Sequence, residues 1–293
     1  MKKSDFICPV CGRGLEEQKW GFRCRAGHSF DRSARGYTNF LLPSQTKGKI
    51  PGDNKQMVDA RRDFLELGLY RLLSDTLNRE VLRWAQSRPE GEKKILDAGC
   101  GEGYYTARLQ EAMEAAGQPG RILGFDISKF ALAAAGRRTR QVQWAAASLF
   151  ELPVENGWAD LAVNIFAPYS EAEFGRVLHK DGLLIMVFPG PRHLYGLKEI
   201  LYEKPYENDV KHYVLKDFSF TGRVTVGDTV TVEGKQNIQN LFSMTPYYWK
   251  TSPEAAQRLQ ALEALTTEIQ FDLLFYHKDK NPGRQKPGRE AKR

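Results

Sequence analysis

The sequence is poor in cysteine and lacks any long apolar run. Only four of its 293 residues are cysteine, which is too few for a fold stabilised by a framework of disulfides. No apolar run reaches the ~18 residues that a membrane-spanning helix needs, and the N-terminus runs into Cys8 without the apolar segment of a secretion signal. No internal repeat is evident. These absences predict a cytoplasmic protein with reduced thiols and no membrane contact.

Acidic residues are scarce at both ends of the chain. The net charge of the whole sequence is +7. Residues 1–36 hold eight basic and four acidic side chains, and residues 278–293 hold seven basic and two acidic ones. The middle of the chain therefore carries a net charge of −2. A nearly neutral body with basic ends favours a polyanionic partner, although a tail that only keeps the protein soluble explains the C-terminal charge equally well.

Composition divides the chain into four segments. The first is rich in glycine, cysteine and charge and is too short to bury a core without a staple. The second begins as an irregular connector (37–54) and continues with apolar residues at helical spacing, which predict two helices with a break near Gly68. The third is long enough for one α/β domain, and the fourth is basic, has no periodicity and is expected to be disordered. The segments span residues 1–36, 37–90, 91–277 and 278–293.

Predicted strands and helices alternate along the third segment. This alternation favours an α/β fold with a doubly wound parallel sheet. The expected strands are 94–97, 121–126, 142–147, 161–166 and 183–188, and the expected helices are 104–116, 129–138 and 171–178. Farther along, Gly227-Asp228 between two β-rich runs indicates a hairpin. A helix over 253–265 and a strand over 269–276 complete the prediction.

Four candidate metal ligands lie close together near the N-terminus. Cys8 and Cys11 form one pair, and Cys24 and His28 form another after twelve intervening residues. Zinc requires a closed tetrahedron of such donors, and two short knuckles supply two ligands each. Because the predicted site has four protein ligands and no open position, we assign it a structural role. Reduced cysteines placed by chance are the alternative.

A glycine-rich turn follows the first predicted strand of the α/β segment. It has the pattern acid-x-Gly-x-Gly-x-Gly, formed by Asp97, Gly99, Gly101 and Gly103. This pattern is typical of methyltransferases that bind S-adenosylmethionine, whereas a dinucleotide fingerprint would need glycine or alanine where this chain has tyrosine. Asp97 is a candidate to hold the ammonium group of the cofactor. Asp126, which ends the next strand, is a candidate to accept both ribose hydroxyls, and a purely structural turn is the alternative.

Several short motifs complete a resemblance to a known family. They are Asp-Arg-Ser-Ala-Arg-Gly-Tyr at 31–37, Pro-Gly-Asp at 51–53, Ala-Arg-Arg at 60–62, Cys-Gly-Glu-Gly-Tyr-Tyr-Thr at 100–106, Pro-Gly-Pro-Arg-His-Leu at 189–194, Met-Thr-Pro at 244–246 and Trp249. Together with the zinc knuckles, they resemble the bacterial 23S rRNA (guanine-N1)-methyltransferases of the tylosin-resistance type. The resemblance covers residues 6–277. It implies a Rossmann-like class I methyltransferase sheet with a small N-terminal zinc-binding module.

The resemblance also implies site residues and partners. Gly101 and Glu102 match cofactor contacts in the turn, and Tyr70 and His193 match two further cofactor contacts. If the family resemblance is set aside, the local sequence predicts that Tyr70 is an aromatic residue of the core and that His193 lies at the start of a helix. The resemblance implies that the zinc module helps to grip a 23S rRNA hairpin, that the protein is a homodimer, and that methylation affects macrolide susceptibility.

The segment after the fourth predicted strand is the expected substrate side of the site. Asn164, Phe166 and Tyr169 lie there, in a pattern that only loosely resembles the Asn-Pro-Pro-Tyr loop of methyltransferases that modify amino groups. Phe166 or Tyr169 is a candidate to stack on a base turned out of the RNA, with core packing as the alternative. No residue stands out as the acceptor of the guanine N1 proton. A methyltransferase of small molecules or proteins, and a non-catalytic zinc-containing RNA-binding protein, remain alternatives.

Overall fold

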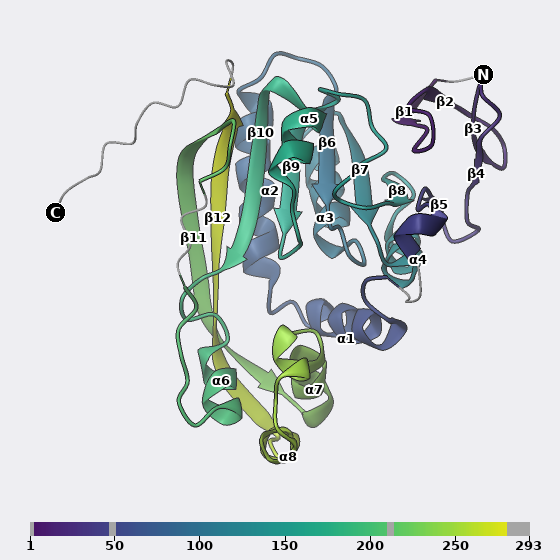
Figure 1. The fold of residues 1–293 in the computed structure, drawn as a ribbon. Coiled ribbons are helices and arrows are strands. Elements are labelled where there is room, and N and C mark those ends of the chain that lie inside the picture. Colours follow the sequence, from purple (N-terminus) through teal and green to yellow (C-terminus); the bar gives the residue numbers. More distant parts are fainter. Residues whose placement is uncertain (1–2, 47–50, 210–213, 280–293) are drawn as a thin grey trace.

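The computed structural model describes residues 3–46, 51–209 and 214–279. Residues 3–36, which we call the N-terminal module, contain a four-stranded antiparallel sheet that lies to one side of the larger remainder, the body (Figure 1). The zinc motif alone did not predict these strands. They are β1 (Lys3–Ile7), β2 (Gly14–Glu17), β3 (Gly21–Cys24) and β4 (Ser29–Asp31).

The body is built on one eight-stranded sheet with the order β11-β12-β10-β9-β6-β7-β8-β5. The six strands from β10 to β5 run parallel, whereas β12 pairs antiparallel with both β10 and β11. The five strands that the sequence predicts for the doubly wound sheet all run parallel, as expected, and β12, which is antiparallel to both of its neighbours at one edge, makes the complete sheet mixed. Its strands are β5 (Tyr37–Asn39), β6 (Lys93–Ala98), β7 (Gly120–Asp126), β8 (Gln143–Ala146), β9 (Ala159–Ile165), β10 (Leu178–Pro189), β11 (Phe218–Glu233) and β12 (Ala264–Lys278).

Four of the eight α-helices in the described part of the chain begin at a side-chain cap. Asn54, Ser128, Ser170 and Ser252 each accept a hydrogen bond from a backbone N–H in the first turn of the helix that follows. The break predicted near Gly68 is confirmed, because this residue has a φ of 77° between two helices. The α-helices are α1 (Lys55–Glu66), α2 (Arg71–Gln86), α3 (Tyr104–Ala115), α4 (Lys129–Arg138), α5 (Glu171–Val177), α6 (Tyr195–Leu201), α7 (Lys235–Ser243) and α8 (Pro253–Gln260), and the 3-10 helices are η1 (Pro43–Thr46) and η2 (Pro246–Trp249).

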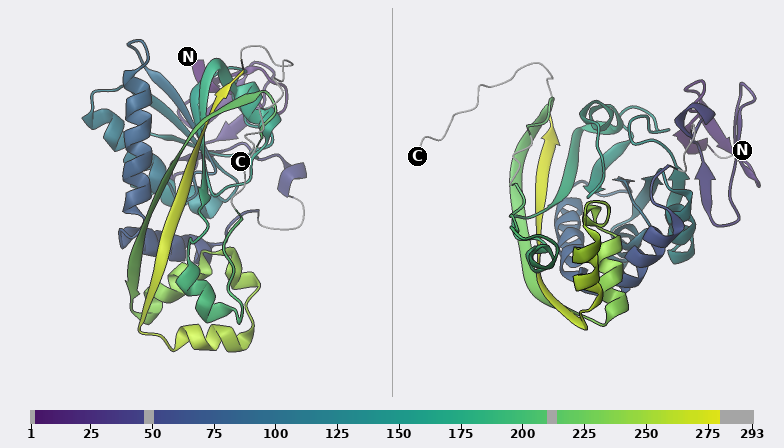
Figure 2. Two further views of the ribbon diagram at one scale, coloured as in Figure 1. Left: turned by 90° about the vertical axis from the view of Figure 1, so that its left-hand side faces the viewer. Right: turned by 60° about the horizontal axis from the view of Figure 1, so that its bottom comes forward.

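The two faces of the sheet carry two separate apolar layers. Alternate residues of β6 divide between them: Ile95 belongs to the layer with α1, α2, α3 and α7, and Leu96 belongs to the layer with α5. The N-terminal module shares the second layer, where the Phe6 ring lies 4.9 Å from Phe40 and 6.1 Å from Phe125. At the far end, β11 and β12 extend to a lobe formed by α6, α7 and α8 (Figure 2).

The predicted hairpin at Gly227-Asp228 is wrong, because β11 passes straight through these two residues. Gly227 pairs with Gln270 and Asp228 with Ile269 on β12. Val224, Val226 and Val230 all pack against the same apolar layer. Side chains of one strand alternate between the two faces of the sheet, and these three residues keep that alternation on both sides of Gly227-Asp228, whereas a turn would interrupt it. A Cβ atom on Gly227 would lie 2.9 Å from the carbonyl oxygen of Ile269, so the glycine here permits close strand contact.

Other boundaries also differ from the prediction. The expected helix 253–265 ends at Gln260, and the chain enters β12 at Ala264 because this segment pairs with the end of β11. The expected connector 37–54 contains β5 and η1, and Lys278, the expected first residue of the tail, ends β12. Residues 280–293 lie outside the described residues. Among the residues that the structure describes, no helix has the length and apolar character needed to cross a bilayer.

Candidate active site and metal centre

The four predicted metal ligands converge in the N-terminal module. The ligand atoms of Cys8, Cys11, Cys24 and His28 all lie within 4.8 Å of one another. Nδ1 of His28 lies 3.4 Å from Sγ of both Cys8 and Cys24, and the Sγ atoms of Cys11 and Cys24 are 3.8 Å apart. Donors of a tetrahedral zinc site are separated by about 3.7 Å, since Zn–S bonds are about 2.3 Å long. The cluster therefore has the composition and spacing of a structural zinc site.

Two glycines close the turns that bring these ligands together. Gly12 and Gly27 have φ values of 69° and 91°, in the left-handed region that side-chain-bearing residues avoid. The N–H of Gly12 donates to the carbonyl of Cys8, and that of Gly27 donates to the carbonyl of Cys24. Each knuckle is therefore a hydrogen-bonded turn that directs its two ligand side chains toward a common centre.

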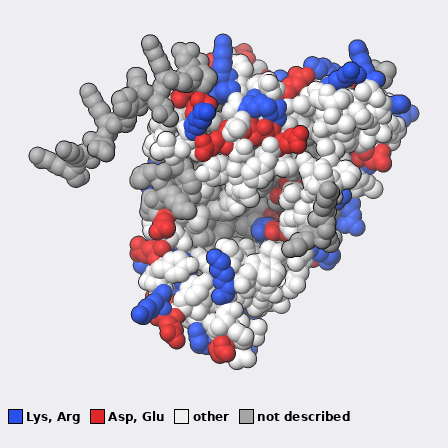
Figure 3. Space-filling view, in the orientation of Figure 1, with Lys and Arg blue, Asp and Glu red and all other residues white. Residues whose placement is uncertain are grey.

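A cleft of about 740 Å³ opens at the carboxyl edge of the parallel strands. This volume lies in the range of sites for small molecules and cofactors, and Figure 3 shows the surface hollowed between the upper body and the α6–α8 lobe. Most of the predicted site residues line the cleft: Tyr70, Asp97, Gly99, Gly101, Glu102, Asp126, Phe166 and His193. Gly103, Asn164 and Tyr169 do not line it.

Two carboxyl groups are held at the base of this cleft. Asp126 accepts hydrogen bonds from the backbone N–H groups of Gly101 (3.0 Å) and Ser128 (2.7 Å), and its pKa is raised by burial. Oδ2 of Asp97 accepts a hydrogen bond of 2.5 Å from the hydroxyl of Thr106, while Oδ1 is buried without a partner among the described residues. Burial raises the pKa of Asp97 to about 7. A cationic group bound at Oδ1 would offset this cost of desolvation.

The glycine turn and Glu102 contribute in different ways. A Cβ atom on Gly101 would meet no atom within 4 Å, so its backbone borders open space, whereas one on Gly103 would lie 2.9 Å from Ala135. Gly101 thus offers backbone to a ligand, and Gly103 allows α3 to start close to α4. The Glu102 carboxylate is buried and accepts a hydrogen bond of 2.6 Å from Nε of Arg138. This ion pair occupies one oxygen of the predicted cofactor contact.

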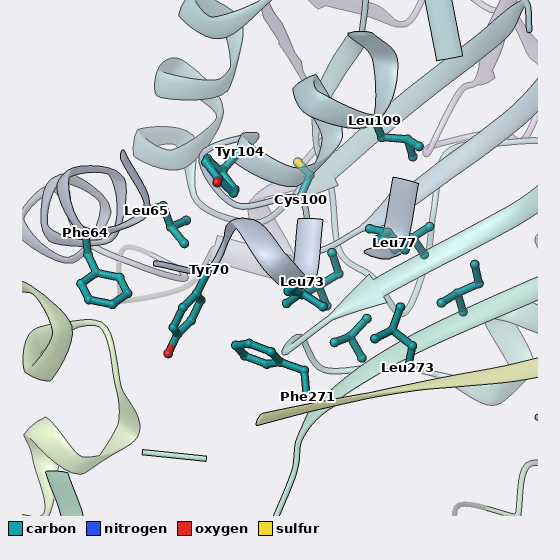
Figure 4. Close-up of a cluster of buried hydrophobic side chains, with 14 of the residues drawn as sticks. Phe64, Leu65, Tyr70, Leu73, Leu77, Cys100, Tyr104, Leu109, Phe271 and Leu273 are labelled. Carbon is teal, nitrogen blue, oxygen red and sulfur yellow. The ribbon is translucent and has the colours of Figure 1, made fainter. Parts of the chain in front are cut away.

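Tyr70 and His193 lie in contact across the cleft, although they are 123 positions apart. The Tyr70 ring lies between Phe64 and Phe271, and its hydroxyl points away from Leu73 and Leu77 (Figure 4). Nδ1 of His193 accepts a hydrogen bond from the N–H of Gln270, so its ring proton lies on Nε2, 3.2 Å from the Tyr70 hydroxyl oxygen.

Burial and this contact together set the protonation states of His193 and Tyr70. Burial lowers the pKa of His193 to about 3, so the ring is neutral at physiological pH. Because the Tyr70 oxygen accepts the proton on Nε2, the hydroxyl of Tyr70 keeps its own hydrogen available to a group in the cleft. The ring of Tyr70 is buried, as the core interpretation expects, and the residue also lines the cleft. Its role as a cofactor contact stays a prediction.

The three tentative substrate residues differ in their surroundings. Phe166 has a φ of 53° and an exposed fraction of 44%, and its ring stacks on that of His193 at 6.4 Å. Such a φ costs a bulky residue about 1–2 kcal/mol, which is typical of functional positions. Asn164 is buried and donates to the carbonyls of Ala98 and Pro168, so it shapes the loop. Tyr169 packs against the second apolar layer.

Sequence reasoning did not identify several residues that line the cleft. They include Arg61, Tyr105, Phe150 and the segment 244–247. Arg61 and the Met-Thr-Pro segment were noticed only as family motifs, because no local pattern predicts which side of a helix or loop will face a distant sheet edge. Phe150 is 63% exposed and follows β8 in a turn that has no recognisable signal.

Comparison with known proteins assigns both parts of the chain. Residues 6–49 match a zinc-ribbon family described as "RlmA, N-terminal", and residues 95–182 match a methyltransferase domain family. The chain is 32% identical over 282 residues to a putative 23S rRNA (guanine-N(1)-)-methyltransferase of Micromonospora griseorubida. The matched region covers 89% of this chain and 91% of that protein. The chain belongs to the 23S rRNA (guanine-N1)-methyltransferase family.

The chain is also similar to a second named relative and to a solved structure. It is 30% identical over 274 residues to the 23S rRNA (guanine(748)-N(1))-methyltransferase of Streptomyces fradiae, covering 92% of this chain and 94% of that protein. Among solved structures, a putative methyltransferase from Bacillus halodurans C-125 matches 69% of this chain and 98% of its own, with 13% identity and a TM-score of 0.43. The resemblance stated from the sequence is confirmed.

The cofactor of this family member is S-adenosylmethionine, and the N-terminal module holds a structural zinc ion. Both fit the residues present. The cofactor carries an ammonium group and a ribose diol, and the cleft offers the unpartnered Oδ1 of Asp97, the carboxylate of Asp126 and the open backbone at Gly101. The zinc site offers three thiols and one imidazole, which are donors that zinc prefers.

Proposed function

We propose that this protein transfers the methyl group of S-adenosylmethionine to N1 of a guanine in a hairpin of 23S rRNA. The observation that carries the proposal is the pair of carboxyl groups, the buried Asp97 and the partly buried Asp126, beside open glycine backbone in one cleft. Bound there, the cofactor supplies an electrophilic methyl group on a sulfonium. The names of the relatives support guanine N1 as the target atom.

The predicted cofactor residues that line the cleft each have a proposed task. Asp97 binds the ammonium group, and Asp126 accepts hydrogen bonds from the ribose hydroxyls. Tyr70 and His193 border the methionine end, where the hydroxyl of Tyr70 has a proton to donate. The remaining cofactor contacts are the backbone of the turn at Gly99, Gly101 and Glu102. The sequence prediction also included Gly103, but this glycine packs against Ala135 and allows α3 to start close to α4.

The target base needs a surface on which to rest once it leaves its stack. Phe166 presents an exposed ring over His193 at the mouth of the cleft, and base stacking on an aromatic ring is worth roughly 1–3 kcal/mol. We assign Phe166 to this role, with Asn164 holding the loop in shape through its two hydrogen bonds. Tyr169 supports the loop from the apolar layer beneath it.

The N-terminal module is proposed to contact the RNA backbone around the target. Lys and Arg side chains gather on the module, at the upper right of Figure 3. Zinc coordination by Cys8, Cys11, Cys24 and His28 holds these side chains in place, and the RNA gains affinity from the phosphates that they neutralise. A homodimer, a cytoplasmic location and an effect on macrolide susceptibility remain predictions that follow from the family.

The proposal is tested by methyl transfer from tritiated cofactor to total rRNA, to a protein extract and to a metabolite extract in parallel. Label in 23S rRNA, with a primer-extension stop at one guanine, is the expected result, because a methyl group on N1 blocks base pairing. Asp126→Ala should abolish the stop, and Asp228→Ala on exposed β11 should retain it. Label only in protein or metabolites, or in none of the three, would overturn the proposal.

A further inference from the structure

Arg61 is the one lysine or arginine among the described residues that line the cleft. It lies on α1 and shares the cleft with Asp53, Asp97, Glu102 and Asp126. Glu102 already has a cationic partner in Arg138, whereas Asp97 and Asp126 are the proposed contacts for the ammonium group and the ribose. The cofactor also carries a carboxylate, and no residue has yet been assigned to it.

The guanidinium of Arg61 has N–H donors that are not used in its ion pair. Its Nη1 pairs with Oδ2 of Asp53, and Nε and Nη2 have no hydrogen-bond partner among the described residues. The side chain is 27% exposed, so it reaches the open part of the cleft. Arginine presents its donors as a planar fork that matches a carboxylate, and the pairing with Asp53 fixes the orientation of that fork.

The neighbours of Arg61 belong to the cofactor end of the cleft. Its positive charge opposes the increases in pKa that burial produces at Asp126, Glu102 and Tyr105. Tyr105 lines the same cleft, and its hydroxyl is buried without a partner among the described residues. Arg61 therefore acts on the residues around the glycine turn.

The adjacent Arg62 lies on the same helix, faces away from the cleft and provides a comparison for Arg61. Arg62 pairs with Asp59 and Asp63 on its own helix and does not line the cleft. Its exposed fraction of 37% is close to that of Arg61. The two residues thus form a natural pair, with one charge directed into the site and one held on the surface.

We infer that Arg61 binds the carboxylate of the methionine part of the cofactor. This rests on the proposed roles of Asp97 and Asp126, and it adds the anionic subsite that those two acids lack. Arg61 is a binding residue in this scheme, held in position by Asp53. A phosphate of the RNA is the competing anion, but the partial burial of Arg61 and its action on the glycine turn favour the cofactor.

The test compares two ligands by calorimetry on zinc-loaded full-length protein. One ligand is S-adenosylhomocysteine, and the other is its decarboxylated analogue, which keeps the ammonium group and lacks only the carboxylate. Arg61→Gln should weaken binding of the first about tenfold or more and leave the second unchanged. Arg61→Lys should fall between, because it keeps the charge and loses the fork. Arg62→Gln should match the unmodified protein with both ligands.

Each other outcome overturns the inference. Unchanged affinity for S-adenosylhomocysteine in Arg61→Gln would remove Arg61 from the site, and an equal loss for both ligands would show that it acts on fold or on another group. Weaker binding of rRNA with unchanged cofactor binding would assign Arg61 to a phosphate. If Arg61→Gln fails to fold, Arg61→Lys decides. Failure of the proposed function is seen separately, as intact discrimination between the two ligands without methylation of rRNA.

Discussion

The N-terminal module and the body hold their side chains in place by different means. The module buries few apolar side chains, chiefly Phe6, Leu15 and Phe22, and these rest against the body rather than against one another alone. The body has an apolar layer on each face of its sheet. A segment this small depends on its metal, whereas the body depends on burial.

Charge is also arranged differently in the two regions. Arg25 and Arg32 of the module form exposed ion pairs with Glu16 and Glu17, and such pairs exchange easily for other anions because they contribute little net energy. In the cleft, the carboxyl group of Asp97 is buried and that of Asp126 is partly buried, and removal from water raises the pKa of both. The module is therefore suited to phosphates at a solvated surface, and the cleft to one small ligand that carries positive charge.

Removal of zinc should give the largest effect and should separate the two regions. The double change Cys8→Ser and Cys11→Ser should release the metal, unfold the knuckles and weaken binding of 23S rRNA about 100-fold or more, because several phosphate contacts are lost together. Cofactor affinity should fall much less. Filter binding of RNA and calorimetry with S-adenosylhomocysteine measure the two losses, and equal losses would contradict the division of roles.

Loss of the Asp126 carboxylate, which is proposed to bind the ribose hydroxyls, should weaken cofactor binding much more than RNA binding. Asp126→Ala removes a charged acceptor, and hydrogen bonds to charged groups contribute about 1.5–3 kcal/mol, so cofactor affinity should fall roughly 10- to 100-fold. RNA affinity should stay within about twofold of the unmodified protein. Asp228→Ala is the matched control on an exposed strand. An unchanged dissociation constant for S-adenosylhomocysteine would exclude Asp126 from the site.

The pH dependence of cofactor binding sharpens the contrast further. The pKa of Asp97 is raised to about 7 in the free protein, and an ammonium group binds only the ionised carboxylate. Binding therefore lowers this pKa, and affinity should fall by up to about tenfold for each pH unit below 7 while staying level above it. Calorimetry from pH 5.5 to 8 measures this slope. Asp97→Asn should bind weakly with no such slope, and an identical slope in that variant would assign the titration elsewhere.

The smallest expected effect concerns the contact between the two regions. Asp5 of the module accepts hydrogen bonds from Arg121 (3.0 Å) and from Nε1 of Trp158 (3.1 Å) in the body. Asp5→Ala removes the partner of Trp158 Nε1 and one of the two carboxylate partners of Arg121, which keeps its ion pair with Glu92. The cost should be about 1–2 kcal/mol, which should lower the melting temperature by roughly 3–6 °C. Asp31→Ala, on an exposed strand of the module, is the control. Equal melting temperatures for the two variants would show that the Asp5 contacts do not stabilise the attachment of the module, which then depends on apolar packing and on contacts such as the backbone hydrogen bond from Ile7 to Pro153.

Local patterns predicted much of the fold and site. Helix α4 has the predicted bounds, and the glycine turn lies between β6 and α3 as expected, because strand, turn and helix signals there depend on neighbouring residues. Predictions failed where a strand partner decides the structure. The segment around Gly227 is extended because β12 lies beside it, and β5 exists because Tyr37–Asn39 pairs with β8.

The sequence by itself determined which four residues gather in the metal cluster, where the glycine turn lies and which two acids end the strands beside it, since each follows from residue type and short spacing. Only the tertiary structure decided that Tyr70 meets His193, that Arg61 and not Arg62 faces the cleft, and that Phe166 is exposed in a left-handed conformation. Residue type and spacing fix what a side chain can bind. The packing of distant elements fixes which side chains share one space, because those contacts depend on the whole chain.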